Sequence, residues 1–179
     1  GTRYVKGQPA DGYTLLAIAN TFARVPATIS DAGYDPVRDF TGVSQTCDIP
    51  MVVVVNPSLP VKNFRELIAL AKKRPGELTY GSAGNGSAIH MATALFEHMA
   101  DVKLTHVPYK GGAPAQTDLL GGQIHLMFEN VVTALPHVQS GKLRALGVTS
   151  PERSARLPDV PASDESGVKG YASVPWYTI

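Results

Sequence analysis

Residues 78–99, with the sequence LTYGSAGNGSAIHMATALFEHM, decide the fold that this chain is expected to adopt. They open with a short run at Leu78–Gly81 that predicts a strand, and they close with a helix expected over Ser87–Met99. A turn rich in glycine and serine separates the two elements. A strand, a turn and a helix in this order form the first half of a βαβ unit.

The same alternation continues on both sides of this stretch. Asn63, followed three residues later by Glu66, predicts the capped start of another helix, which ends at Pro75-Gly76. Further helices are expected at Ala113–Leu120, Val131–Gln139 and, as a short turn, Ala162–Ser166. Further strands are expected at Tyr13–Ala19, Thr41–Thr46, Met51–Val55, Leu104–Val107, Ile124–Phe128 and Leu143–Thr149. Strands that alternate with helices favour an α/β fold with a mostly parallel sheet.

The pattern also predicts two α/β lobes. Residues 58–146 form a self-contained lobe, whereas residues 1–57 and 147–179 form a first lobe that is discontinuous and incomplete. Met51–Val55 and Leu143–Thr149 are expected to be the crossing strands that join the lobes. A double crossing between two α/β lobes produces a cleft with a hinge.

Composition excludes several classes of protein. A formal net charge of +1 over 179 residues, without a basic cluster of note, argues against a nucleic-acid partner. A single cysteine, Cys47, rules out a disulfide within the chain. The longest apolar run, Met51–Val55, is far shorter than the ~20 residues of a membrane span. No motif for a metal or a cofactor occurs, and none is expected.

Three predicted strands are each followed by a loop of small and polar residues. These loops are Tyr80–Ser87, Pro108–Gly112 and Glu129-Asn130. Ligands of open α/β sheets bind outside the carboxyl ends of the strands, so the three loops are expected to converge there. Backbone N–H groups and hydroxyls near helix N-termini suit a carboxylate. The simpler alternatives are that Lys110 is only solvated and that Ser82 and Ser87 only cap helices.

Other chemistries fit the sequence poorly. Gly81, Gly84 and Gly86 give the spacing G-x-x-G-x-G rather than that of a dinucleotide-binding loop, and no lysine follows as in a P-loop. No G-x-S-x-G elbow of a hydrolase is present. Ser87 and His90 lie three residues apart on one helix face, yet no orienting acid is evident beside them. His90 is therefore expected to serve packing.

Several long blocks then match a known family in order. These blocks are Pro9–Leu16, Tyr34–Phe40, Pro75–Ser82, His106–Gly112, Gly141–Ser150 and Leu157–Pro161. On these residues the chain resembles the substrate-binding receptors of tripartite tricarboxylate transporters, also called the Bug family of periplasmic solute-binding proteins. The resemblance covers nearly the whole chain, and it suggests a piece truncated at both ends.

The resemblance implies a type II periplasmic-binding fold whose two lobes close on a small carboxylate. The receptor would work in the periplasm, deliver its ligand to membrane permease subunits and catalyse no reaction. The ligand-binding residues that it implies are Asn20 and Thr21 in the first lobe, and Ser82, Ala83, Gly84, Asn85, Gly86, Ser87, Lys110, Gly111 and Asn130 in the second.

Two other functions stay open at this stage. The same pocket would serve a ligand-sensing extracytoplasmic domain with a signalling partner, and a small α/β enzyme would need a nucleophile or base that the loops hardly offer. The identity of the carboxylate also stays open. Because an incomplete first lobe would leave sheet edges and apolar surface uncovered, we expect the truncated chain to self-associate.

Overall fold

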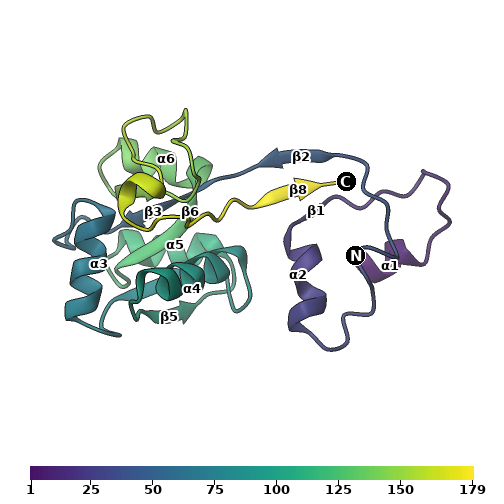
Figure 1. Ribbon diagram of the computed structural model, residues 1–179, viewed down its shortest axis with the longest axis horizontal. Helices are drawn as coiled ribbons and strands as arrows, with labels where there is room; N and C mark the ends of the chain where they lie inside the picture. Colours follow the sequence, from purple (N-terminus) through teal and green to yellow (C-terminus); the bar gives the residue numbers. More distant parts are fainter. The chain divides into compact units, whose positions relative to one another are not determined.

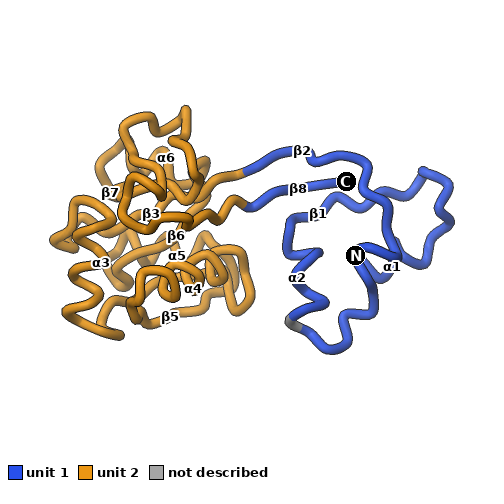
Figure 2. The backbone as a smooth tube through the Cα atoms, viewed as in Figure 1, with its two compact units in different colours: residues 1–48, 175–179 blue, residues 49–174 orange. Residues whose placement is uncertain are grey.

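The computed structural model describes residues 1–27 and 29–179, which form two compact units (Figure 2). Unit 1 comprises residues 1–48 and 175–179, and unit 2 comprises residues 49–174. These bounds differ from those of the expected lobes, because β3 (Met51–Val55) and β7 (Arg144–Val148) are hydrogen-bonded within the sheet of unit 2. The lobe bounds for the whole protein stay a prediction.

Unit 2 contains a five-stranded sheet in the order β5-β4-β6-β3-β7. Its remaining strands are β4 (Thr79–Ser82), β5 (Thr105–Pro108) and β6 (Leu126–Asn130). The expected parallel pairing holds for β5-β4-β6, whereas β3 pairs antiparallel with both of its neighbours. The reason is that Met51, where β3 begins, pairs with Asn130, where β6 ends, so β3 must run the opposite way.

The α-helices of unit 2 lie beside its sheet (Figure 1). They are α3 (Phe64–Lys73), α4 (Ala88–Ala100), α5 (Gly112–Leu120) and α6 (Val131–Gln139). The predicted cap of α3 is confirmed, since the side chain of Asn63 accepts a hydrogen bond of 2.9 Å from the N–H of Glu66. The helix expected over 131–139 runs through Pro136 without interruption. A short 3-10 helix, η1 (Asp164–Ser166), lies in the expected place.

Helices α4 and α5 cover opposite faces of the sheet. Phe128 of β6 packs against Phe96 of α4, with ring centroids 5.4 Å apart. The neighbouring residue Met127, whose side chain points the other way along the strand, approaches the start of α5 at Gly112. Phe64 of α3 joins the aromatic cluster on the α4 face. The core of unit 2 is therefore built on both faces of the sheet.

Unit 1 is built from short elements. They are α1 (Thr2–Lys6), β1 (Ile18–Ala19), α2 (Thr21–Thr28), β2 (Gln45–Asp48) and β8 (Trp176–Thr178). The strands form an antiparallel sheet in the order β1-β8-β2. Phe22 stacks on Tyr34 with ring centroids 5.2 Å apart, and Lys6 forms an ion pair of 2.7 Å with Asp39.

Two strand predictions in unit 1 need correction. Of the strand expected over Tyr13–Ala19, only the last two residues pair with β8, and Tyr13 is 93% exposed. The strand expected over Thr41–Thr46 lies later, at β2, where Gln45, Cys47 and Asp48 pair with β8. Apolar side chains without a sheet and a covering layer to pack on do not hold a strand.

No helix in the described part of the chain is both long enough and apolar enough to cross a membrane.

Candidate functional site

Three parallel strands of unit 2 end at the same edge of the sheet. Ser82 at the end of β4 pairs with Pro108 at the end of β5, and β6 runs in the same direction on the other side of β4. Each strand leads directly into a helix, α4, α5 or α6, so three helix N-termini lie at this edge (Figure 1). The first N–H groups of a helix have no partner inside it and carry a partial positive charge. This edge can therefore present several hydrogen-bond donors to an anion.

The loop from β4 to α4 has a backbone that only glycine adopts readily. Gly84 and Gly86 have φ angles of +116° and +73°, both in the left-handed region. A Cβ atom at Gly84 would also lie 3.3 Å from the carbonyl oxygen of Tyr109. Asn85, between the two glycines, is exposed. The loop thus places one amide side chain outward on a tightly turned backbone.

The hydroxyls of this loop are already hydrogen-bonded within the protein. Ser82 is fully buried, and its Oγ lies 2.6 Å from Nε2 of His106 and accepts the N–H of Gly84 at 3.1 Å. Ser87 caps α4, because its Oγ accepts the N–H of His90 at 3.3 Å. Both serines therefore shape the loop, as the capping alternative for Ser87 supposed.

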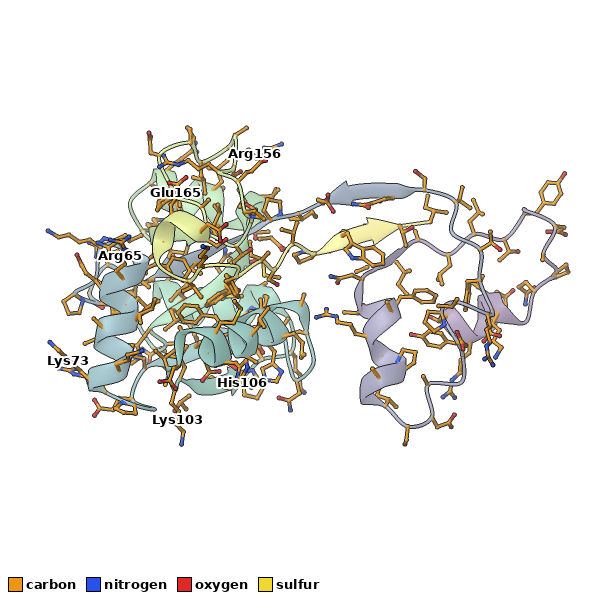
Figure 3. The ribbon with its side chains drawn as sticks, in the orientation of Figure 1. Arg65, Lys73, Lys103, His106, Arg156 and Glu165 are labelled. Atoms are coloured by element: carbon orange, nitrogen blue, oxygen red, sulfur yellow. The ribbon has the colours of Figure 1, made fainter. Side chains whose placement is uncertain are left out.

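His90, which was expected to serve packing, lies next to His106 of β5 beside this loop. The rings of His90 and His106 are stacked with centroids 4.2 Å apart and planes 5° apart. Tyr80 stacks on the other side of His106 at 4.8 Å. His106 is labelled in Figure 3, beside α4. Sequence spacing alone could not reveal this cluster, because it depends on the parallel pairing of β4 with β5, which sets Tyr80 next to His106.

Burial acts on the ring of His106, and a hydrogen bond fixes the ring of His90. Burial, together with the neighbouring His90, lowers the pKa of His106 below its usual value. Nδ1 of His90 accepts the N–H of Gly86 at 3.0 Å, which requires a lone pair on that nitrogen. His90 was expected to serve packing alone, but this hydrogen bond shows that it also holds the loop.

The loop from β5 to α5 is anchored on one side and open on the other. The hydroxyl of Tyr109 donates to Asp118 at 2.7 Å, and burial followed by this carboxylate raises the pKa of Tyr109 to about 12. Lys110 is exposed, and Gly111 has a φ of +121° at the start of α5. No side chain caps this helix. Its first N–H groups therefore point into the loop region without an internal partner.

The third strand end carries a buried acid. Oε1 of Glu129 accepts the N–H of Asn130 at 2.9 Å and the hydroxyl of Thr133 at 2.8 Å. Glu129 is 5% exposed, and burial raises the pKa of its carboxyl in spite of these two bonds. Asn130 is half-buried at the start of α6, and its side chain forms no capping bond. Its amide stays available at the same edge of the sheet.

The predicted site residues thus fall into two groups. The members that unit 2 brings to one edge are Ser82, Ala83, Gly84, Asn85, Gly86, Ser87, Lys110, Gly111 and Asn130. Asn20 and Thr21 lie in unit 1 at the start of α2, where the N–H of Asn20 donates to Trp176 at 2.9 Å. For these two residues, ligand contact stays a prediction.

A surface hollow of about 410 Å³ lies elsewhere in unit 2, among residues that precede β4 and β5. It is lined by Ala71, Lys72, Pro75, Asp101, Val102 and Lys103. Because these residues lie at the opposite ends of the strands from the three loops, the hollow is not part of the candidate site. Within the described residues, no group of three or more His, Cys, Asp or Glu side chains is placed to hold a metal ion.

Comparison with known proteins identifies relatives along the whole chain. The family described as tripartite tricarboxylate transporter family receptor (TctC) matches residues 1–179. Protein BugT of Bordetella pertussis is 37% identical over 182 residues, which cover 100% of this chain and 56% of BugT. The chain thus spans about half the length of this curated relative.

Solved structures of similar proteins share the fold. The periplasmic binding protein BugD is 35% identical and superimposes with a TM-score of 0.87. The R. palustris protein Rpa4515, solved with adipate, is 38% identical with a TM-score of 0.85. Each match covers 99% of this chain and 60% of the other chain. The α/β fold of a periplasmic binding protein is therefore shown for the part that the chain spans.

Proposed function

Because the chain belongs to the family of tripartite tricarboxylate transporter receptors, we propose that it binds a small carboxylate and delivers it to membrane permease subunits. The observation that supports this most is the convergence of three helix N-termini at one sheet edge. We propose the periplasm as its location, as for the similar protein BugD. The solved relative that contains adipate supports a carboxylate as ligand.

The topology supports a ligand between the ends of β4 and β6. From β4 the chain turns into α4 on one face of the sheet, whereas α5 covers the other face. Helix α6 contacts α5, since the side chain of Gln116 donates to the carbonyl of Thr133 at 3.3 Å. The loops after β4 and β6 therefore lead to opposite faces of the sheet. Open α/β sheets bind ligands in the crevice between two neighbouring strands whose connections diverge in this way.

The charges at this edge are compatible with an anion. The exposed Lys110 supplies a positive charge, and the helix N-termini add partial positive charges. Glu129 would repel a carboxylate when ionised, although its carboxyl is buried and already accepts two internal hydrogen bonds, and burial raises its pKa. We assign ligand contact mainly to Asn85, Lys110 and Asn130. The backbone donors are the N–H groups of Ala83, Asn85 and the Lys110-Gly111 turn, because those of Gly84, Gly86 and Ser87 already have partners within the loop or on His90.

Thermal unfolding of the full-length protein with adipate, malate and citrate tests this function. A carboxylate at 100 times its dissociation constant should add about 2.7 kcal/mol to the free energy of unfolding. Asn85→Trp should abolish the shift, because the indole would fill the space above the loop while the exposed position tolerates it. Lys110→Ala should weaken binding by up to about fivefold, since an exposed charge contributes at most about 1 kcal/mol.

Lys169→Ala is the matched control for Lys110→Ala, because Lys169 is an exposed lysine of the same unit away from the three loops. It should bind like the unchanged protein. If no carboxylate stabilises the folded protein, or if Asn85→Trp binds as well as the original, the proposed function is wrong.

A further inference from the structure

The stacked histidines connect the candidate loop to the core of unit 2. His90 holds the loop at Gly86, and His106 holds it at Ser82, so both ends of the Ser82–Ser87 turn are fixed by imidazole nitrogens. The stack continues to the buried ring of Tyr80. A loop held in this way presents its N–H groups in one arrangement.

From this geometry we propose that His90 and His106 are positioning residues that fix the anion-binding loop when neutral and release it on acidification. The inference rests on the proposed carboxylate site. We call these two residues the histidine pair. This proposed role goes beyond the receptor function because it makes the affinity for the ligand depend on pH.

The two histidines respond differently to a proton. A proton on Nδ1 of His90 would face the N–H of Gly86, so that hydrogen bond must break. A proton on Nε2 of His106 could still donate to Ser82 Oγ, whose hydroxyl can turn to the carbonyl of Gly84 at 3.2 Å. His90 is therefore the residue whose protonation releases the loop.

The surroundings of the pair do not stabilise two positive rings. Charged imidazoliums 4.2 Å apart would repel each other, and the neighbour from β4 is the neutral phenol of Tyr80. The acids on adjacent elements have other partners. Glu97 of α4 accepts a hydrogen bond from the N–H of Leu104, and Asp118 of α5 accepts one from the hydroxyl of Tyr109. Within the described residues, no carboxylate is paired with either ring.

The direction of the effect separates this proposal from simple charge attraction. If the histidines acted only as charges, acidification would add positive charge near the loop and tighten carboxylate binding. Release of the loop predicts the reverse. Loss of one ordering hydrogen bond should weaken binding about tenfold between pH 8 and pH 5.

The first arm of the test needs no ligand. The full-length protein is labelled with ¹⁵N-glycine and ¹⁵N-histidine, and its amide and ring signals are followed by NMR from pH 8 to pH 5. We expect the Gly86 amide to shift with the same midpoint as the His90 ring. The exposed Gly42, where an added Cβ would meet nothing within 4 Å, should not follow this midpoint. A Gly86 amide that ignores the His90 titration overturns the proposal.

The second arm measures adipate affinity by calorimetry at pH 8 and pH 5. His90→Asn keeps an acceptor oxygen near the place of Nδ1 but does not titrate, so its affinity should vary much less with pH. His98→Asn, at an exposed position on the same helix, should keep the full pH dependence. Equal or tighter binding at pH 5 by the unchanged protein overturns the proposal.

The two arms also distinguish the failure of the proposed function. If adipate, malate and citrate fail to bind at pH 8, the receptor proposal is contradicted, and the link between Gly86 and His90 is judged by NMR alone. If a carboxylate binds at pH 8 while the Gly86 amide ignores His90, the receptor proposal survives and the histidine pair is rejected as a pH-sensitive device.

Discussion

The two units differ sharply in how much of their chain is buried. In unit 2, a continuous core runs from Met51 to Tyr171 and includes every residue of β3. In unit 1, Pro175 is the only buried residue among those that the structure describes. Large apolar side chains of unit 1, such as Tyr13, Leu15 and Val37, are instead exposed.

The difference teaches that an apolar run becomes a strand only when a sheet and a second layer receive it. Met51–Val55 lies between two neighbouring strands and under helices, so all five residues are buried. Residues 13–19 are comparably apolar, but they meet a single short strand, β8. Burial of apolar surface is the main driving force for folding, and unit 1 has few partners that supply it.

The largest expected effect removes the centre of the core in unit 2. Phe96 is fully buried and contacts the rings of Phe64, Phe128 and Tyr171. Phe96→Ala should lower the free energy of unfolding by about 3–5 kcal/mol, because it leaves a cavity. Leu15→Ala in unit 1 should change it by less than about 0.5 kcal/mol. Urea unfolding followed by circular dichroism compares them, and similar losses would disprove the contrast.

A smaller effect is expected from adding one methyl group to each unit. A Cβ at Gly147 of β7 would collide with the ring of Phe64 and lie 3.0 Å from Ser166 Oγ, whereas a Cβ at Gly42 would meet nothing within 4 Å. Gly147→Ala should therefore cost about 1–3 kcal/mol, and Gly42→Ala should be nearly neutral. The same unfolding assay applies. A neutral Gly147→Ala would mean that Phe64 moves aside freely.

The smallest effect is a difference in pH dependence. The pKa of His106 is lowered by burial and by His90, so the unfolded chain binds the proton more readily, and unit 2 should lose stability as the pH falls below about 6.5. In unit 1, the hydrogen bond from Lys6 lowers the pKa of Asp39. The contribution of the Asp39 carboxylate to the free energy of unfolding should therefore be lost only below about pH 4.

Hydrogen-exchange protection measured from pH 7.5 to pH 3 separates these two windows. We expect β4 and β5 to lose protection first and the segment around Asp39 to lose it later. A common midpoint for both units would show that they do not respond separately to acid.

Much of unit 2 follows from local sequence. The capping pair Asn63 and Glu66, the repeated glycine turns and the helical spacing within 88–100 need only neighbouring residues, and these elements formed where expected. The nine residues predicted for the second-lobe site lie at or just after strand ends, since a loop position depends on where the strand before it stops, and their contact with a ligand stays a prediction.

Pairing between distant segments decided the rest. The reversal of β3, the failure of residues 13–17 to form a strand and the stack of His90 on His106 all depend on which strands become neighbours. The spacing of residues along the chain fixes the periodicity of a helix or strand, but it carries no information on the partner across the sheet. The sequence by itself therefore determined the elements and their order, and only the tertiary structure decided their pairing, because pairing is set by the total burial that competing arrangements achieve.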